Sequence, residues 1–136
     1  VPDVKSAFTP ELILDGGRCY VQRVKVSPQE AIAAVHAAGG VAVAAHPGRT
    51  GLSDDDISQF VAWGLDGIEV QYPQHSEAQT AHFAALATRH GLLVTGGSDD
   101  HGDVNEGRLM GRIRLAYEHV ERLKDAVAQR ASALRH

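Results

Sequence analysis

The sequence has 136 residues, a length typical of one domain with a single packed core. A formal net charge of −4 disfavours broad electrostatic binding to nucleic acid, and no apolar run approaches the roughly 20 residues that cross a bilayer. The only cysteine, Cys19, cannot form a disulfide within the chain. We therefore expect a cytoplasmic protein without redox chemistry, in which the eight histidines need individual explanation.

The first 26 residues lack a regular pattern. The chain begins with Val1 rather than Met, and the segment combines a short helix end, a Gly16-Gly17 turn and an extended stretch. We expect residues 1–26 to connect to an upstream part that is absent from this sequence, and residues 27–136 to form the folded portion.

Serines mark the starts of three predicted helices. Ser27 and Ser76 begin capping boxes, and Ser53 is followed by three aspartates that favour the positive end of a helix dipole. A glycine after each apolar face ends the helix. The predicted helices run from Ser27 to Gly39, from Ser53 to Gly64 and from Ser76 to Gly91, and an amphipathic helix runs from about Tyr117 to near the C-terminus.

Short apolar runs alternate with these helices at residues 41–45, 67–70 and 92–96. Such runs suit strands that are buried on both faces. Alternation of strands and helices predicts an α/β fold with a parallel sheet and right-handed crossovers. Three such units amount to a third to a half of a β/α barrel, or to a small open sheet.

Polar side chains with metal-binding chemistry follow the predicted strands. Ligands of parallel α/β proteins bind beyond the carboxyl ends of the strands. His46 follows the first strand, Glu69 ends the second, and Asp99 and His101 follow the third. In Asp-x-His both side chains can face one side of a loop while Asp100 points away. Imidazole and carboxylate are the ligands expected for zinc, manganese or iron(II) in a hydrolytic site.

Each of these residues also has a purely structural interpretation. The segment "GGSDDHG" could be a solvated polar turn, and His46 could cap the loop after it. Arg49 and Arg108 flank the predicted site and are candidates for binding phosphate, although surface arginines are common. His75 is either a substrate-binding group or a helix-entry residue.

The remaining histidines are expected to lie outside the site. His36 falls in the middle of the first helix, away from its apolar positions, and is expected to face solvent. His82 and His90 lie on the helix that begins at Ser76, where His90 suits the negative end of the dipole. His119, on the last helix, is expected at the surface.

Three segments together resemble the C-terminal half of the PHP (polymerase and histidinol phosphatase) family: "AAGGVAVAAHPGR", "GLDGIEVQYPQHS" and "HGLLVTGGSDDHG". The resemblance covers roughly residues 27–112. It implies the C-terminal part of a distorted (β/α)7 barrel with up to three divalent ions (Mn, Zn, Fe or Mg) at its carboxyl-end face. His46 matches the metal-binding histidine of the family's "AHP" motif, and Asp99 and His101 match the ligands of its "GSDxHG" motif.

The resemblance also implies a function. It indicates a metal-dependent phosphoesterase that hydrolyses phosphomonoesters of small molecules or nucleotides, such as a nucleoside bisphosphate or the end of a short oligonucleotide, with metal-activated water as nucleophile. The family's early-strand ligands, including a His-x-His pair, have no counterpart before His46. The chain alone is therefore expected to be inactive, to need the missing N-terminal half of the barrel, and to expose sheet edges that favour self-association. Histidinol-phosphatase-like activity, a non-catalytic PHP module and a metal-free α/β domain remain alternatives.

Overall fold

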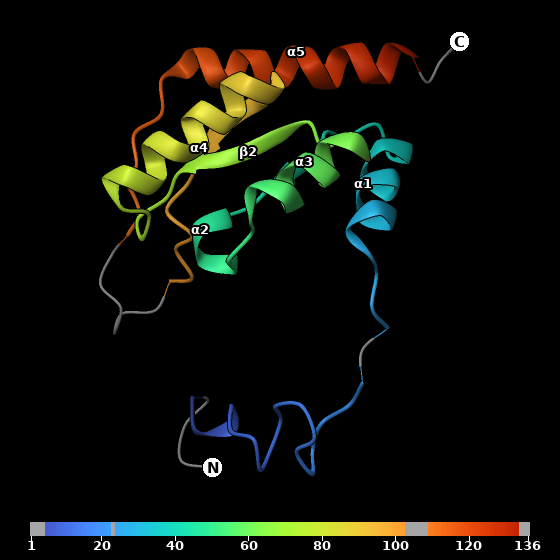
Figure 1. Ribbon diagram of the computed structural model, residues 1–136, viewed down its shortest axis with the longest axis vertical. Coiled ribbons are helices and arrows are strands. Elements are labelled where there is room, and N and C mark those ends of the chain that lie inside the picture. Colours follow the sequence, from blue (N-terminus) through green and yellow to red (C-terminus); the bar gives the residue numbers. More distant parts are fainter. Residues whose placement is uncertain (1–4, 23, 103–108, 134–136) are drawn as a thin grey trace.

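The computed structural model describes residues 5–22, 24–102 and 109–133 and contains a parallel three-stranded sheet with the order β1-β2-β3 (Figure 1). All the predicted helices and strands are present. The elements in chain order are η1 (Lys5–Ala7), α1 (Pro28–Ala37), β1 (Val43–Ala44), α2 (Pro47–Thr50), α3 (Asp54–Ala62), β2 (Gly67–Gln71), α4 (Glu77–His90), β3 (Leu93–Gly96) and α5 (Tyr117–Ala133).

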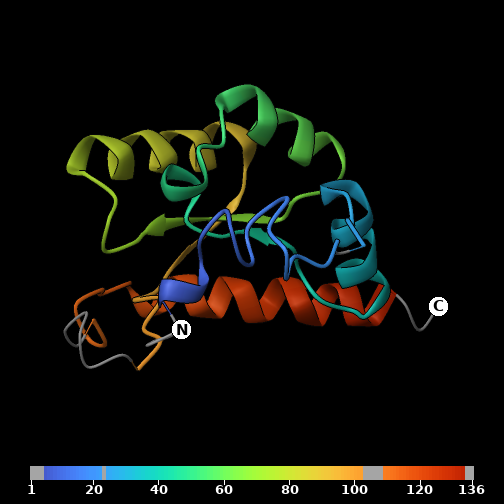
Figure 2. The same cartoon turned by 90° about the horizontal axis from the view of Figure 1, so that it is seen from below.

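Strand β2 lies in the middle of the sheet. Val43 of β1 pairs with Gly67, and Gly67 in turn pairs with Leu93 of β3, so the carboxyl ends of all three strands reach the same edge. Helices α3 and α4 lie on one side of the sheet and α5 lies on the other (Figure 2). Residues 5–20 form η1 and a series of turns, and an extended stretch leads from them to α1 (Figure 1).

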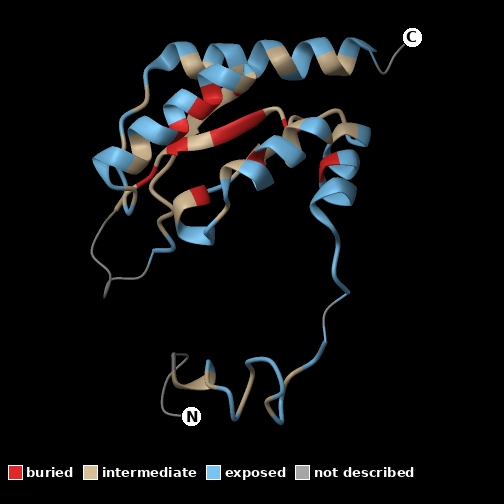
Figure 3. Cartoon of the chain, viewed as in Figure 1, coloured by how far each residue is buried: buried red, intermediate tan, exposed pale blue. Residues whose placement is uncertain are grey.

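The core lies between β2 and the helices that cover it (Figure 3). Ile57 of α3, Ile68 of β2 and Leu86 of α4 are almost completely buried, and Phe83 and Val70 extend the same cluster. Burial of each large aliphatic side chain contributes about 1.5–3 kcal/mol. Within the described residues, every helix is too short or too polar to span a membrane.

The capping signals operate as predicted. Ser27 and Glu30 form a reciprocal capping box at the start of α1, and Ser76 and Gln79 form one at the start of α4. Ser53 pairs in the same way with Asp56. Each box satisfies backbone N–H groups that the first helical turn leaves without partners.

Acid is expected to weaken two of these caps. Hydrogen bonds from Ser27 lower the pKa of Glu30 below 4.5, and hydrogen bonds from Ser53 lower the pKa of Asp56 below 3.8, with the hydroxyl bond the larger cause in both. A carboxylate whose pKa is lower in the folded state stabilises the fold above its unfolded pKa, and this stabilisation is lost as the pH falls through the folded value.

Thermal unfolding measured between about pH 6 and about pH 3 checks this expectation. Glu30→Gln keeps an acceptor oxygen but has no charge to titrate, so its melting temperature should fall less than that of the unsubstituted chain. Equal falls in the two proteins would show that the cap contributes nothing to acid sensitivity.

His36 and His119 correct two sequence-based expectations. The side chain of His36 is only 22% exposed, because its Nε2 lies 2.7 Å from Oδ2 of Asp66, the residue that precedes β2. The side chain of His119 is 21% exposed, and its Nδ1 is buried. Neither histidine is a solvent-facing residue, because each helix turns that position toward a neighbouring element.

Candidate metal site

His46 ends the connection from β1 and is the N-cap residue of α2. Its backbone is left-handed, with φ 32° and ψ 58°, a conformation that is uncommon outside glycine. Glu69 Oε2 of β2 accepts the His46 N–H at 2.8 Å, and the His46 ring lies 5.3 Å from the ring of Tyr72 between centroids. His46 Nδ1 is buried and has no hydrogen-bond partner among the described residues.

Asp99 lies in the loop after β3, in contact with residues from two other strand ends. It too has a left-handed backbone, with φ 51°. Its Oδ2 accepts hydrogen bonds from the Tyr72 hydroxyl at 3.1 Å and from Arg49 Nη1 at 3.3 Å. Arg49 Nη1 also donates to the Tyr72 oxygen at 3.0 Å. Asp99 is therefore held by Tyr72 after β2 and by Arg49 of α2.

His101 is exposed and has a defined tautomer. Its Nδ1 lies 2.7 Å from the carbonyl oxygen of Asp99, which can only accept, so Nδ1 carries the proton. The lone pair of the neutral ring is then on Nε2. Metal-binding histidines commonly donate their other ring N–H to a carbonyl in this way. The same Nδ1 lies 3.9 Å from Asp99 Oδ1.

Asp100 has a different role from its neighbours. Its carboxylate accepts the backbone N–H groups of Gly102 at 2.7 Å, Met110 at 2.8 Å and Leu109 at 3.0 Å. These bonds, that from Gly102 foremost, lower the pKa of Asp100. Asp100 thus ties Gly102 to the start of the segment that leads to α5, and this use of its carboxylate agrees with its omission from the predicted ligands.

The predicted phosphate-binding residues lie in different surroundings. Arg49 reaches the site and pairs with Asp99. His75 accepts the Gly48 N–H at Nε2, at 3.2 Å, and its Nδ1 lies 3.0 Å from the Val70 carbonyl, so both ring nitrogens have backbone partners. Arg108 lies outside the described residues.

The donor atoms fit part of a metal site. No group of three or more His, Cys, Asp or Glu side chains is arranged around a single ion position in residues 5–22, 24–102 and 109–133. The chemistry of the predicted ligands nevertheless suits a divalent ion, since His46 Nδ1 lacks a partner and His101 presents a lone pair at Nε2. His46, Asp99 and His101 therefore remain predicted ligands.

A cavity of about 530 Å³ opens beside Asp99 and His101, a size typical of small-molecule sites. Arg49, Asp99 and His101 give it a charged and polar side, and Phe8 and Leu109 give it an apolar side. Tyr72 and Gln74 also line it. Phe8 could not be identified from the sequence, because it belongs to no motif and follows no strand; Gln74 lies in the segment "GLDGIEVQYPQHS" but was not selected as a site residue.

The fold and the site define a parallel α/β domain with candidate metal ligands at the carboxyl ends of its strands. No family model matches the chain. It is 43% identical over 91 residues to a phosphoribosyl 1,2-cyclic phosphate 1,2-diphosphodiesterase from Eggerthella lenta, an alignment of 67% of this chain and 34% of that protein. It is 36% identical over 115 residues to a 3',5'-nucleoside bisphosphate phosphatase from Chromobacterium violaceum, covering 82% of this chain and 40% of that protein.

A solved structure matches the fold as well as the sequence. It is described as a candidate metal-dependent phosphoesterase from Bifidobacterium adolescentis, and it aligns with a TM-score of 0.72 and 35% identity over 90% of this chain and 44% of its own length. The two curated relatives are enzymes that hydrolyse phosphate esters. The chain spans 34% to 44% of the length of each of these three proteins.

Proposed function

We propose that this chain is the C-terminal half of a PHP-family phosphoesterase that hydrolyses phosphomonoesters of small molecules or nucleotides with the help of divalent metal ions. The observation that carries the proposal is the contact between strand ends: Arg49 after β1 and Tyr72 after β2 both bond to Asp99 after β3. His46 directly precedes α2, the helix that carries Arg49, and His101 lies in the same loop as Asp99. The relatives' activity on phosphate esters supports the same chemistry.

In this proposal, some of the site residues bind metal and another binds the phosphate group of the substrate. His46, Asp99 and His101 would hold metal, and Arg49, a planar bidentate donor, would bind a phosphate oxygen when substrate replaces its contact with Asp99. When bound, divalent ions supply Lewis acidity toward phosphate oxygens and make the attacking water more acidic. Manganese, zinc, iron and magnesium are all compatible with imidazole and carboxylate ligands, and a complete cluster of up to three ions would need ligands beyond those found here.

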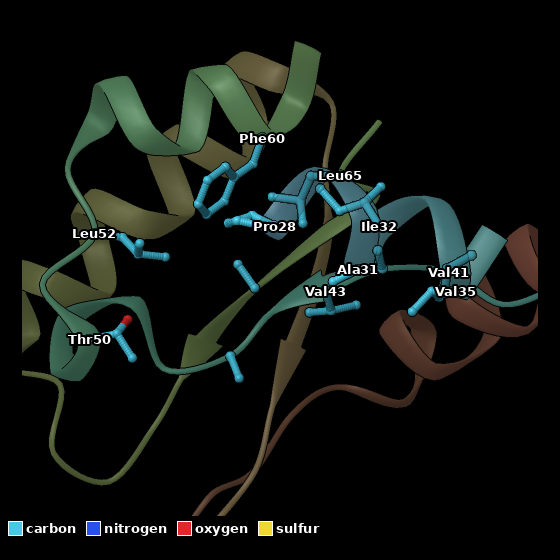
Figure 4. Close-up of a pocket in the computed structure, with 13 residues that line it drawn as sticks. Pro28, Ala31, Ile32, Val35, Val41, Val43, Thr50, Leu52, Phe60 and Leu65 are labelled. Atoms are coloured by element: carbon cyan, nitrogen blue, oxygen red, sulfur yellow. The ribbon is translucent and has the colours of Figure 1, made fainter. Parts of the chain in front are cut away.

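An open apolar groove supports the proposal of a missing half. A groove of about 650 Å³ runs beside β1 (Figure 4). The side chains of Ile32 of α1, Val43 of β1, Phe60 of α3 and Leu52 between α2 and α3 converge on it. Within the described sheet β1 pairs with β2 alone. An additional strand of the proposed (β/α)7 barrel would pair with β1 and cover this groove, and in its absence the exposed edge favours self-association.

Two proteins test the proposal: residues 1–136 alone and the longer protein that carries an N-terminal half. The longer protein should hydrolyse a chromogenic phosphomonoester, lose this activity when EDTA removes the metal and regain it with Mn²⁺. Residues 1–136 alone should bind Mn²⁺ weakly and show no turnover, because three ligands do not complete a metal cluster.

The outcomes separate the alternatives. Strong turnover by residues 1–136 alone would contradict the proposed division of the site. Activity of the longer protein that is indifferent to EDTA would contradict metal dependence. A longer protein that binds metal but hydrolyses no phosphate ester would be a non-catalytic PHP module.

A further inference from the structure

Strand β2 supplies no predicted ligand, although it lies between the two strands whose loops do. Its residue Glu69 is partly buried. One carboxylate oxygen, Oε2, accepts the His46 N–H at 2.8 Å. The other, Oε1, lies so close to Gly97 that a Cβ on that glycine would be 3.3 Å away. The Glu69 carboxylate therefore lies between Gly97, in the loop after β3, and His46, at the end of the connection after β1.

The bond to His46 acts on a strained residue. A non-glycine residue in a sparsely populated backbone region costs about 1–3 kcal/mol and persists only where the surroundings hold it. With φ 32° and ψ 58°, His46 is such a residue. A hydrogen bond to a charged acceptor contributes about 1.5–3 kcal/mol, which is enough to offset strain of this size.

The backbone conformation of His46 decides where its imidazole lies. The left-handed residue turns the chain from the β1 connection directly into α2, whose first residue, Pro47, is buried. A change of His46 to an extended or right-handed conformation would swing the side chain away from Tyr72, whose ring now lies 5.3 Å from the imidazole. No side-chain hydrogen bond holds the imidazole at Nδ1 within the described residues, so its direction depends on the backbone.

We propose that Glu69 is a positioning residue that holds His46 in the left-handed conformation and so aims its imidazole at the metal site. The part of this inference that concerns metal rests on the proposed function. Partners that orient a metal ligand typically change metal affinity by about 10- to 100-fold when removed. Glu69 is expected to act in this range without contacting the metal itself.

Two substitutions separate the hydrogen bond from the shape of the side chain. Glu69→Gln keeps an acceptor oxygen at the same position, whereas Glu69→Met keeps the length and removes the acceptor. Glu77→Met, at an exposed position in the first turn of α4, is the matched control. Backbone NMR chemical shifts of His46 report its φ without any metal, and calorimetric titration with Zn²⁺ reports affinity.

We expect Glu69→Met to move the His46 shifts away from those of a left-handed residue and to weaken Zn²⁺ binding by about 10- to 100-fold. Glu69→Gln should retain the His46 shifts and most of the affinity, and Glu77→Met should change neither. Unchanged His46 shifts in Glu69→Met would overturn the positioning role, whatever the affinity. A moved His46 with unchanged Zn²⁺ binding would support the backbone contact and show instead that His46 is not a ligand, which contradicts the proposed function.

Discussion

Replacing Asp66 with alanine is expected to lower the free energy of unfolding by about 3–5 kcal/mol, because it leaves charged and polar partners without their shared acceptor in a poorly hydrated position. The Asp66 side chain is 16% exposed. Its carboxylate accepts the Ala42 N–H at 2.7 Å, lies 2.7 Å from His36 Nε2, and pairs with Arg130 Nη2. One carboxylate thus joins α1, the approach to β1, the start of β2 and α5.

Urea unfolding followed by circular dichroism measures this effect. Asp66→Asn keeps an acceptor for the Ala42 N–H but loses the charge that faces Arg130, so its destabilisation should lie between zero and that of Asp66→Ala. Asp125→Ala, at an exposed position on α5, is the control and should change stability by no more than about 0.5 kcal/mol. A loss below about 1 kcal/mol for Asp66→Ala would mean that α1 and α5 are held by apolar packing alone.

The importance of Asp66 was not visible in the sequence, whereas the elements that it joins were. Helix starts and ends depend on residues three or four positions apart. The capping boxes of Ser27 with Glu30 and of Ser76 with Gln79 are such pairs and can be recognised in the sequence. The parallel sheet followed from the alternation of strands and helices. These features are local, so a single sequence suffices to predict them.

Contacts between residues far apart in the sequence could not be predicted, because a local pattern does not specify them. His36 and Asp66 are separated by 30 positions, and Asp66 and Arg130 by 64. Nothing in the apolar pattern of α1 indicates that a polar position will meet a carboxylate at the start of a strand. The pattern therefore predicts that His36 faces solvent, whereas its side chain contacts Asp66, directly before β2.

In the candidate site, too, residues in local motifs could be predicted and contacts between distant residues could not. The residues in motifs, His46, Asp99 and His101, could be selected because the carboxyl ends of parallel strands share one edge. Glu69 and Tyr72 lay in a recognisable segment, but their contacts depend on β2 being the central strand, which the alternation of elements alone does not fix. The pairing of Arg49 with Asp99 likewise required the loops after β1 and β3 to meet across β2.

Replacing Asp99 with asparagine in the longer protein is expected to reduce kcat/KM for a phosphomonoester at least about a hundredfold, a loss of about 2.7 kcal/mol of transition-state stabilisation. Asparagine keeps an oxygen for the Tyr72 hydroxyl and for Arg49, so the fold should be retained. It removes the negative charge that favours the binding of a divalent ion. The affinity for Mn²⁺ should fall in parallel, and added Mn²⁺ should restore part of the activity.

Two further variants decide whether the effect belongs to a metal ligand. His101→Ala should also lower Mn²⁺ affinity and activity, because Nε2 is the atom that its tautomer leaves available. His82→Ala removes a histidine whose Nε2 lies 2.7 Å from Asp54 between α3 and α4, away from the strand ends, and should change activity less than about twofold.

A fall in the activity of Asp99→Ala without a fall in its Mn²⁺ affinity would give a different meaning to the contacts at Asp99. The carboxylate would then serve to hold Arg49 and Tyr72 across the strand ends rather than to bind metal. Since asparagine preserves those acceptors, Asp99→Asn should then retain nearly full activity, and only Asp99→Ala should lose it. The pair of substitutions therefore separates the charge of Asp99 from its hydrogen bonds, which are the two properties that the site geometry assigns to it.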